Sequence, residues 1–139
     1  MAQIVVLDDN YTNCVWMMLI LKRGGYYGPE ICMMESTLTQ LMGDGVNSGL
    51  ALMLRERPAL IILDGRMPDE GDWYRFAAFL RGHGFAVPIM VVSLQPDDMS
   101  ERAIQEGTIN AFCLRPTDLN PERPDVKHLL ATVGRLLAG

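Results

Sequence analysis

The segment that decides the fold is Leu60-Ile61-Ile62-Leu63-Asp64, in the middle of the chain. Its first four residues are large and apolar without polar alternation, which is typical of a strand buried on both faces of a parallel sheet. Pro58 lies just before the segment and Met67-Pro68 shortly after it, so residues that favour turns bound it. We therefore interpret Asp64 as a polar residue at the carboxyl end of a buried strand.

Four more short apolar segments are spread along the chain on either side of this one. The predicted strands, in order, are residues 4–7, 31–34, 60–63, 89–92 and 111–114. Apolar residues at helical spacing fill the intervals and predict helices at residues 15–21, 50–55, 73–81, 99–106 and 126–137. Ser36 or Thr37 is expected to cap a further helical turn, and the glycine-rich residues 43–49 are expected to form a loop.

Strands that alternate with helices predict an α/β fold whose parallel sheet is covered on both faces. Right-handed crossovers then give a doubly wound (βα)5 arrangement with a five-stranded sheet. The chain has 139 residues, which suits one domain, and no internal repeat is visible. We expect residues 1–139 to form a single domain.

The composition narrows the class of partner. A net charge of −5 argues against nucleic acid as a direct partner. Cys14, Cys32 and Cys113 are too scattered to indicate a disulfide framework or a zinc site. No signal peptide is visible, and the longest apolar run, residues 15–21, is far shorter than the ~20 residues that span a bilayer. We expect a cytoplasmic protein without membrane contact.

Polar residues stand where the predicted strands end. They are Asp8-Asp9 after the first strand, Asp64 after the third, Ser93 after the fourth and Arg115 after the fifth. The carboxyl ends of parallel strands meet at one edge of the sheet, where ligand sites form. Two unit charges ~4 Å apart interact by about 4 kcal/mol at an effective dielectric of 20, so gathered carboxylates need a cation. All-oxygen ligands favour Mg²⁺. The alternative, above all for Asp8, is that these acids only cap helices.

Together, these segments resemble the receiver domains of two-component response regulators. The motifs that carry the resemblance are Leu7-Asp8-Asp9-Asn10, Leu63-Asp64-Gly65-Arg66-Met67-Pro68, Val91-Val92-Ser93 and Phe112-Cys113-Leu114-Arg115-Pro116. Each motif is weak alone, but their order on a (βα)5 chain is specific. The resemblance covers nearly the whole chain and implies the flavodoxin-like receiver fold.

The resemblance implies that Asp64 accepts a phosphoryl group from a histidine kinase or a phosphotransfer protein. Mg²⁺ would be held by Asp8, Asp9, Asp64 and the backbone carbonyl of Arg66. Ser93 and Arg115 would contact the phosphoryl group. Such a domain is a phosphoacceptor that supports its own phosphoryl transfer and dephosphorylation, and it is not an enzyme.

The resemblance also implies a conformational switch. Ser93 would move toward the phosphoryl group, and Phe112, three residues before Arg115, would rotate inward. The changed surface would be read by a downstream protein or an output domain, neither of which the sequence identifies. Homodimerisation is a habit of the family and stays open here.

Several residues depart from the family pattern. Arg115 stands where the family has Lys, and the two side chains are not interchangeable. Leu94 follows Ser93 where the family usually has a small residue, and we expect its side chain to narrow access to Asp64. Arg66 is interpreted either as a residue that shields the phosphoryl group or pairs with an acid such as Glu70, or as a solvated loop residue. Trp73, beside an acidic loop, is expected to be partly exposed.

Two alternatives to the phosphoacceptor function stay open. One is a degenerate receiver that acts as an interaction module without phosphate, because Arg115 replaces the usual Lys. The other is a Mg²⁺-dependent phosphatase with an Asp nucleophile on the first strand. The sequence disfavours the phosphatase, since the first strand ends in Asp8-Asp9-Asn10 and not in an Asp-x-Asp pattern.

Overall fold

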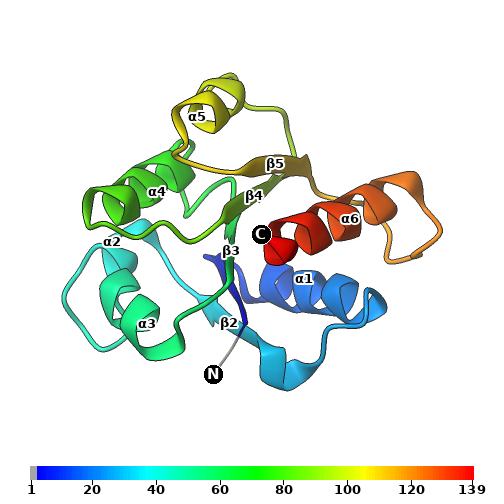
Figure 1. The fold of residues 1–139 in the computed structure, drawn as a ribbon, viewed down its shortest axis with the longest axis horizontal. Helices are drawn as coiled ribbons and strands as arrows, with labels where there is room; N and C mark the ends of the chain where they lie inside the picture. The colour runs from blue at the N-terminus through cyan, green and yellow to red at the C-terminus, as the bar shows by residue number, and fades with distance from the viewer. Residues whose placement is uncertain (1–2) are drawn as a thin grey trace.

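A computed structural model describes residues 3–139; Met1 and Ala2, the first residues of the predicted domain, lie outside the described residues (Figure 1). Within them, one parallel sheet has the strand order β2-β1-β3-β4-β5. The strands are β1 (Ile4–Asp8), β2 (Ile31–Glu35), β3 (Leu60–Asp64), β4 (Ile89–Ser93) and β5 (Ala111–Leu114). The five-stranded α/β fold predicted from the sequence is therefore confirmed.

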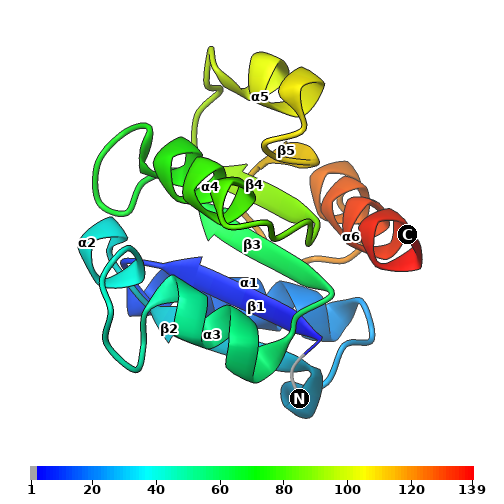
Figure 2. The ribbon, with the colours of Figure 1, turned by 60° about the vertical axis from the view of Figure 1, so that its left-hand side comes forward.

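Helices connect the strands and cover both faces of the sheet. They are α1 (Tyr11–Arg23), α2 (Leu38–Leu41), α3 (Gly49–Glu56), α4 (Asp72–Gly82), α5 (Ser100–Glu106) and α6 (Pro124–Ala138), with a 3-10 turn, η1 (Gly28–Glu30). Figure 2 shows the sheet between α1 on one side and α3 on the other. None of the helices in residues 3–139 combines the length and apolar character needed to cross a membrane.

Two apolar layers follow from the alternation of side chains along each strand. In β1, Ile4 and Val6 point into a layer under α1 and α6, while Val5 and Leu7 point into a layer under α2, α3, α4 and α5. β1 is buried along its whole length, as expected for the centre of a doubly wound sheet. This sandwich holds the ends of β1 and β3 side by side.

Local capping explains where two of the helices begin. Asn10 caps α1, because its side chain accepts a hydrogen bond from the backbone N–H of Asn13, and α1 therefore begins four residues before the predicted start. Thr37 caps α2, as one of the two predicted alternatives, and the Gln40 side chain accepts a hydrogen bond from the Thr37 N–H. The glycine-rich residues between α2 and α3 form turns and bends, so the predicted loop is confirmed.

The prediction that Trp73 is partly exposed is wrong. Its side chain is 0% exposed and packs in the layer that also holds Phe76 and Leu80. Trp73 lies one residue into α4, on the helix face that points to the sheet. The acidic loop before α4 suggested exposure, but the helical register turns Trp73 inward.

Candidate functional site

Carboxylates from β1 and β3 meet at the carboxyl edge of the sheet. Leu7 pairs with Leu63 across the two strands, so Asp8 and Asp64, the next residue in each strand, end up as neighbours. Asp8, Asp9 and Asp64 each offer a carboxylate oxygen, and these oxygens lie within 4.8 Å of one another. Asp8 is only 4% exposed, whereas Asp9 and Asp64 are half-buried. The predicted convergence of the three acids is observed.

Arg115 bridges two of these acids. Its Nη2 lies 2.6 Å from Asp64 Oδ1 and 3.4 Å from Asp8 Oδ2, and its side chain is only 10% exposed. The backbone N–H of Arg115 donates to the carbonyl of Ser93 at 2.7 Å, which fixes the residue to the end of β4. The longer arginine side chain therefore reaches both β1 and β3 from the far side of β4.

Backbone donors hold the two carboxylates in place. The N–H of Asn10 donates to Asp8 Oδ1 at 2.9 Å, and the N–H of Arg66 donates to Asp64 Oδ2 at 3.2 Å. Neither acid caps a helix, since Asn10 caps α1 and the N-cap residue of α4 is Gly71. The alternative that these acids serve only as helix caps is therefore wrong.

Burial and mutual repulsion disfavour the charged forms of the acids. Burial, followed by the negative charge of Asp64, raises the pKa of Asp8 from 3.8 to about 7. Burial also raises the pKa of Asp64, and the Arg115 guanidinium acts against this rise. The single guanidinium thus compensates only part of the charge, and three oxygen donors within reach of one another fit a small divalent cation.

Ser93 and Gly65 lie against each other beside Asp64. Asp64 pairs with Val92, so Ser93 is one position further along β4. A Cβ on Gly65 would overlap the Ser93 side chain, which explains why glycine follows Asp64. The Ser93 hydroxyl accepts a weak bond from the Gln95 N–H at 3.4 Å.

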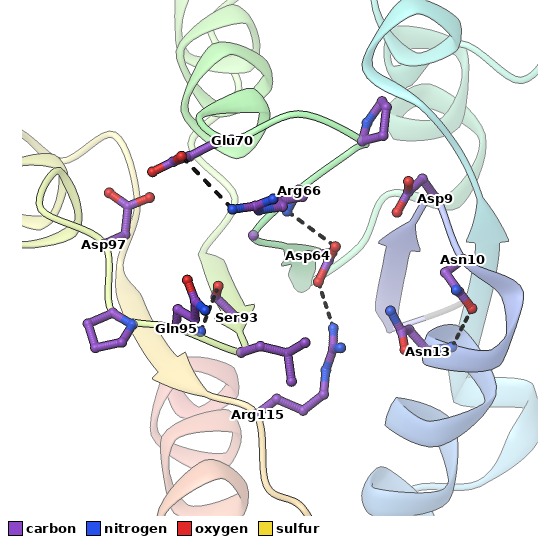
Figure 3. A pocket seen from close by; sticks show the side chains of 14 residues that line it. Asp9, Asn10, Asn13, Asp64, Arg66, Glu70, Ser93, Gln95, Asp97 and Arg115 are labelled. Carbon is purple, nitrogen blue, oxygen red and sulfur yellow. Dashed lines mark hydrogen bonds and ion pairs between the residues drawn. The ribbon is translucent and has the colours of Figure 1, made fainter.

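A cavity of about 450 Å³ opens over these residues (Figure 3). Its lining includes Asp9, Asp64, Arg66, Ser93, Leu94, Asp97 and Arg115. Leu94 lies at the rim with 70% of its surface exposed. The Arg66 side chain is 62% exposed and lies 3.9 Å from Glu70, so it is both solvated and paired, as the two interpretations proposed separately.

Asn13 and Asp97 also line this cavity and were not singled out from the sequence. Asn13 lies in the first turn of α1, and it was missed because the helix was predicted to begin later. The preference of Asn10 for a cap position was the signal that could have found it. Asp97 follows Pro96 in a loop, and no local pattern links it to Trp73, its partner 24 positions earlier.

Comparison with known proteins adds evidence on the fold. No protein-family model matches the chain, and no curated protein matches it either. Among solved structures, it is similar to the receiver domain of the Francisella response regulator 1452, with 14% identity, a TM-score of 0.69 and coverage of 99% of this chain and 98% of that one.

Two further structures give the same result. A DNA-binding response regulator of the LuxR family from Staphylococcus aureus has 17% identity, a TM-score of 0.68 and 99% coverage of both chains. A two-component response regulator from Clostridium difficile has 17% identity, a TM-score of 0.66 and coverage of 99% of this chain and 97% of that one. The chain therefore has the fold of response-regulator receiver domains, with an acidic cluster at the carboxyl edge of its sheet.

Proposed function

We propose that residues 1–139 act as a single receiver domain in which Asp64 accepts a phosphoryl group from a histidine kinase or a phosphotransfer protein. The observation that carries the proposal is the meeting of Asp8, Asp9 and Asp64 in one cluster, with Arg115 in contact with Asp64. Acids from separate strands at the switch point of a doubly wound sheet are placed for ligand binding.

The transfer would run in one step at Asp64. A carboxylate oxygen attacks the phosphorus of a phosphohistidine, a P–O bond forms as the P–N bond breaks, and the imidazole leaves with its electron pair. Arg115, 2.6 Å from the carboxylate, offsets negative charge that spreads over the phosphoryl oxygens. Mg²⁺, held by Asp8, Asp9, Asp64 and the Arg66 carbonyl, would supply further charge neutralisation when bound.

Ser93 and Phe112 would carry the signal away from the site. Ser93 ends β4 beside Gly65 and lines the cavity, and this position supports a hydrogen bond from its hydroxyl to a phosphoryl group on Asp64. Phe112 is half-buried on β5, where it pairs with Val91 of β4. The changed surface would then be read by a partner protein or an output domain.

Labelling with a small-molecule phosphodonor and Mg²⁺, followed by intact-mass measurement, tests the proposal. The expected result is a gain of one phosphoryl group that is absent in Asp64→Ala. A receiver of known activity serves as the control for the reaction conditions. If that control gains mass and this chain does not, the phosphoacceptor function is wrong.

A second candidate function is a receiver that binds its partner without phosphate. The observation that favours it is the double contact of Arg115, which brings a positive charge of the chain itself beside Asp8 and Asp64. Partner binding that is unchanged in Asp64→Ala would support this candidate over the first.

A further inference from the structure

The fully buried side chain of Trp73 makes a polar contact with a loop residue. Its indole N–H donates to Asp97 Oδ2 at 3.1 Å, across the boundary between α4 and the loop that joins β4 to α5. The rest of the ring is enclosed in the apolar layer under α4. Because the ring cannot move with the loop, it provides a fixed anchor for Asp97.

Asp97 in turn organises the loop from residue 94 to residue 99. Its Oδ1 accepts the Met99 N–H at 2.7 Å, and its carbonyl accepts the Ser100 hydroxyl at 2.8 Å. Within residues 3–139, the bond to Trp73 is the only side-chain hydrogen bond that ties this loop to α4. The loop begins directly after Ser93, and Figure 3 shows Asp97 on the opposite side of the cavity from Asp9.

Trp73 also contacts the predicted switch residue. The ring centroids of Trp73 and Phe112 are 6.1 Å apart, with an interplanar angle of 60°. One anchored side chain therefore touches Phe112 through its ring and holds the loop after Ser93 through its N–H.

We propose that Trp73 and Asp97 are positioning residues that fix the resting conformation of the β4–α5 loop and oppose its movement toward Asp64. The part of this proposal that concerns movement rests on the proposed phosphoacceptor function. Once the loop moves, the bond breaks and leaves the buried indole N–H without a partner, which is unfavourable. The bond therefore biases the equilibrium toward the resting state.

Hydrogen exchange of the unphosphorylated protein tests the restraint without reference to phosphorylation. Trp73→Phe removes the N–H and keeps an aromatic ring, so we expect the amides of Gln95 and Met99, which donate hydrogen bonds in this loop, to exchange roughly tenfold faster or more. Tyr74→Phe is the matched control, because it removes the bond from the Tyr74 hydroxyl to Glu106 Oε2, which also joins α4 to α5 but at the far end of α5. Equal exchange in Trp73→Phe and the wild type would overturn the proposal.

The loop side of the bond offers a second set of variants if Trp73→Phe does not fold. Asp97→Ala removes the acceptor from a half-buried loop position and should also accelerate exchange. Asp97→Asn keeps one carbonyl oxygen and should restore slow exchange in part. Exchange in Asp97→Ala as slow as in the wild type would overturn the proposal.

A spectroscopic measurement connects the bond to switching. The chain has two tryptophans, so Trp16→Phe leaves Trp73 as the sole source of an indole N–H signal in nuclear magnetic resonance. We expect this signal to shift when intact mass shows phosphoryl gain, and not in Asp64→Ala. Mass gain without a shift contradicts the switching role. Absence of mass gain contradicts the phosphoacceptor function instead, and the exchange result still decides the restraint.

Discussion

Two arginines with partly or largely buried side chains lie at opposite ends of the sheet and contact different kinds of acceptor. Arg81, at the end of α4, donates to the backbone carbonyls of residues 85, 87, 107 and 108 and to the side chain of Asn110, at distances from 2.8 to 3.2 Å. Arg115, at the carboxyl edge, contacts two carboxylates. Backbone carbonyls stay uncharged at any pH, whereas carboxylates change their charge with pH and bind cations.

The contacts of Arg81 concern the stability of the fold, whereas those of Arg115 concern the candidate site. The Arg81 contacts join the segments that lead into β4 and β5, where no acid or cavity residue of the site lies. Burial lowers the pKa of Arg81, and its hydrogen bonds compensate for that burial. At the other end, the pKa values of Asp8 and Asp64 stay raised despite Arg115. The charged forms of these acids are therefore unfavourable there, and a bound cation would stabilise them.

The largest change in stability is expected for Arg81, which lies at the amino ends of β4 and β5. Arg81→Met removes the donor to five acceptors and should lower the free energy of unfolding by about 2–4 kcal/mol, measured by urea denaturation. Arg102→Met is the control, since that guanidinium is 82% exposed and its loss should not change stability measurably. Similar losses in both variants would mean that the Arg81 contacts contribute nothing specific.

The carboxyl edge should respond in cation binding. Arg115→Met removes the positive charge that competes for Asp8 and Asp64, so the Kd for Mg²⁺ should fall about tenfold by calorimetry. The same variant should accept the phosphoryl group more slowly, because the charge near Asp64 is lost. Arg55→Met, which changes an arginine that donates to the Val46 carbonyl away from the acidic cluster, should leave the Kd unchanged. An unchanged Kd in Arg115→Met would argue that the guanidinium does not influence the cation site.

The pH dependence of stability should distinguish the two edges. The pKa of Asp8 is about 7 in the folded protein and 3.8 ordinarily, so the folded state binds more protons between these values. Without a divalent cation, the free energy of unfolding should therefore fall as pH rises through this range, by an amount on the order of 1 kcal/mol. Asp8→Asn should flatten that dependence in urea titrations at pH 5 and pH 8, whereas Arg81→Met should leave its slope intact.

The smallest change in stability is expected for an arginine whose side chain is mostly exposed. Arg66 lies 3.9 Å from Glu70, and both side chains are mostly exposed. Arg66→Met should change the free energy of unfolding by less than about 0.5 kcal/mol in thermal or urea unfolding. A loss as large as that of Arg81→Met would show that exposure is a poor guide to the role of an arginine in this chain.

The strands, their parallel arrangement and the acids at their ends could be predicted from local sequence patterns. Apolar runs such as Leu60-Ile61-Ile62-Leu63 are local signals, and the helices between them make the strands parallel, so that their carboxyl ends lie at one edge. The meeting of Asp8, Asp9 and Asp64 could therefore be predicted before any coordinates were known. The start of α1 was less well predicted, because a single cap residue decides it.

The pairing of charged and polar side chains that are distant in the chain depends on the folded structure and could not be predicted from the sequence. Arg115 could have reached one acid or none, and its contact with both depends on the spacing of β1, β3 and β5 in the folded sheet. The burial of Trp73 and its bond to Asp97 depend in the same way on the packing of α4 against the sheet. Such contacts join residues far apart in the chain, and local sequence patterns carry no information on distances of this kind.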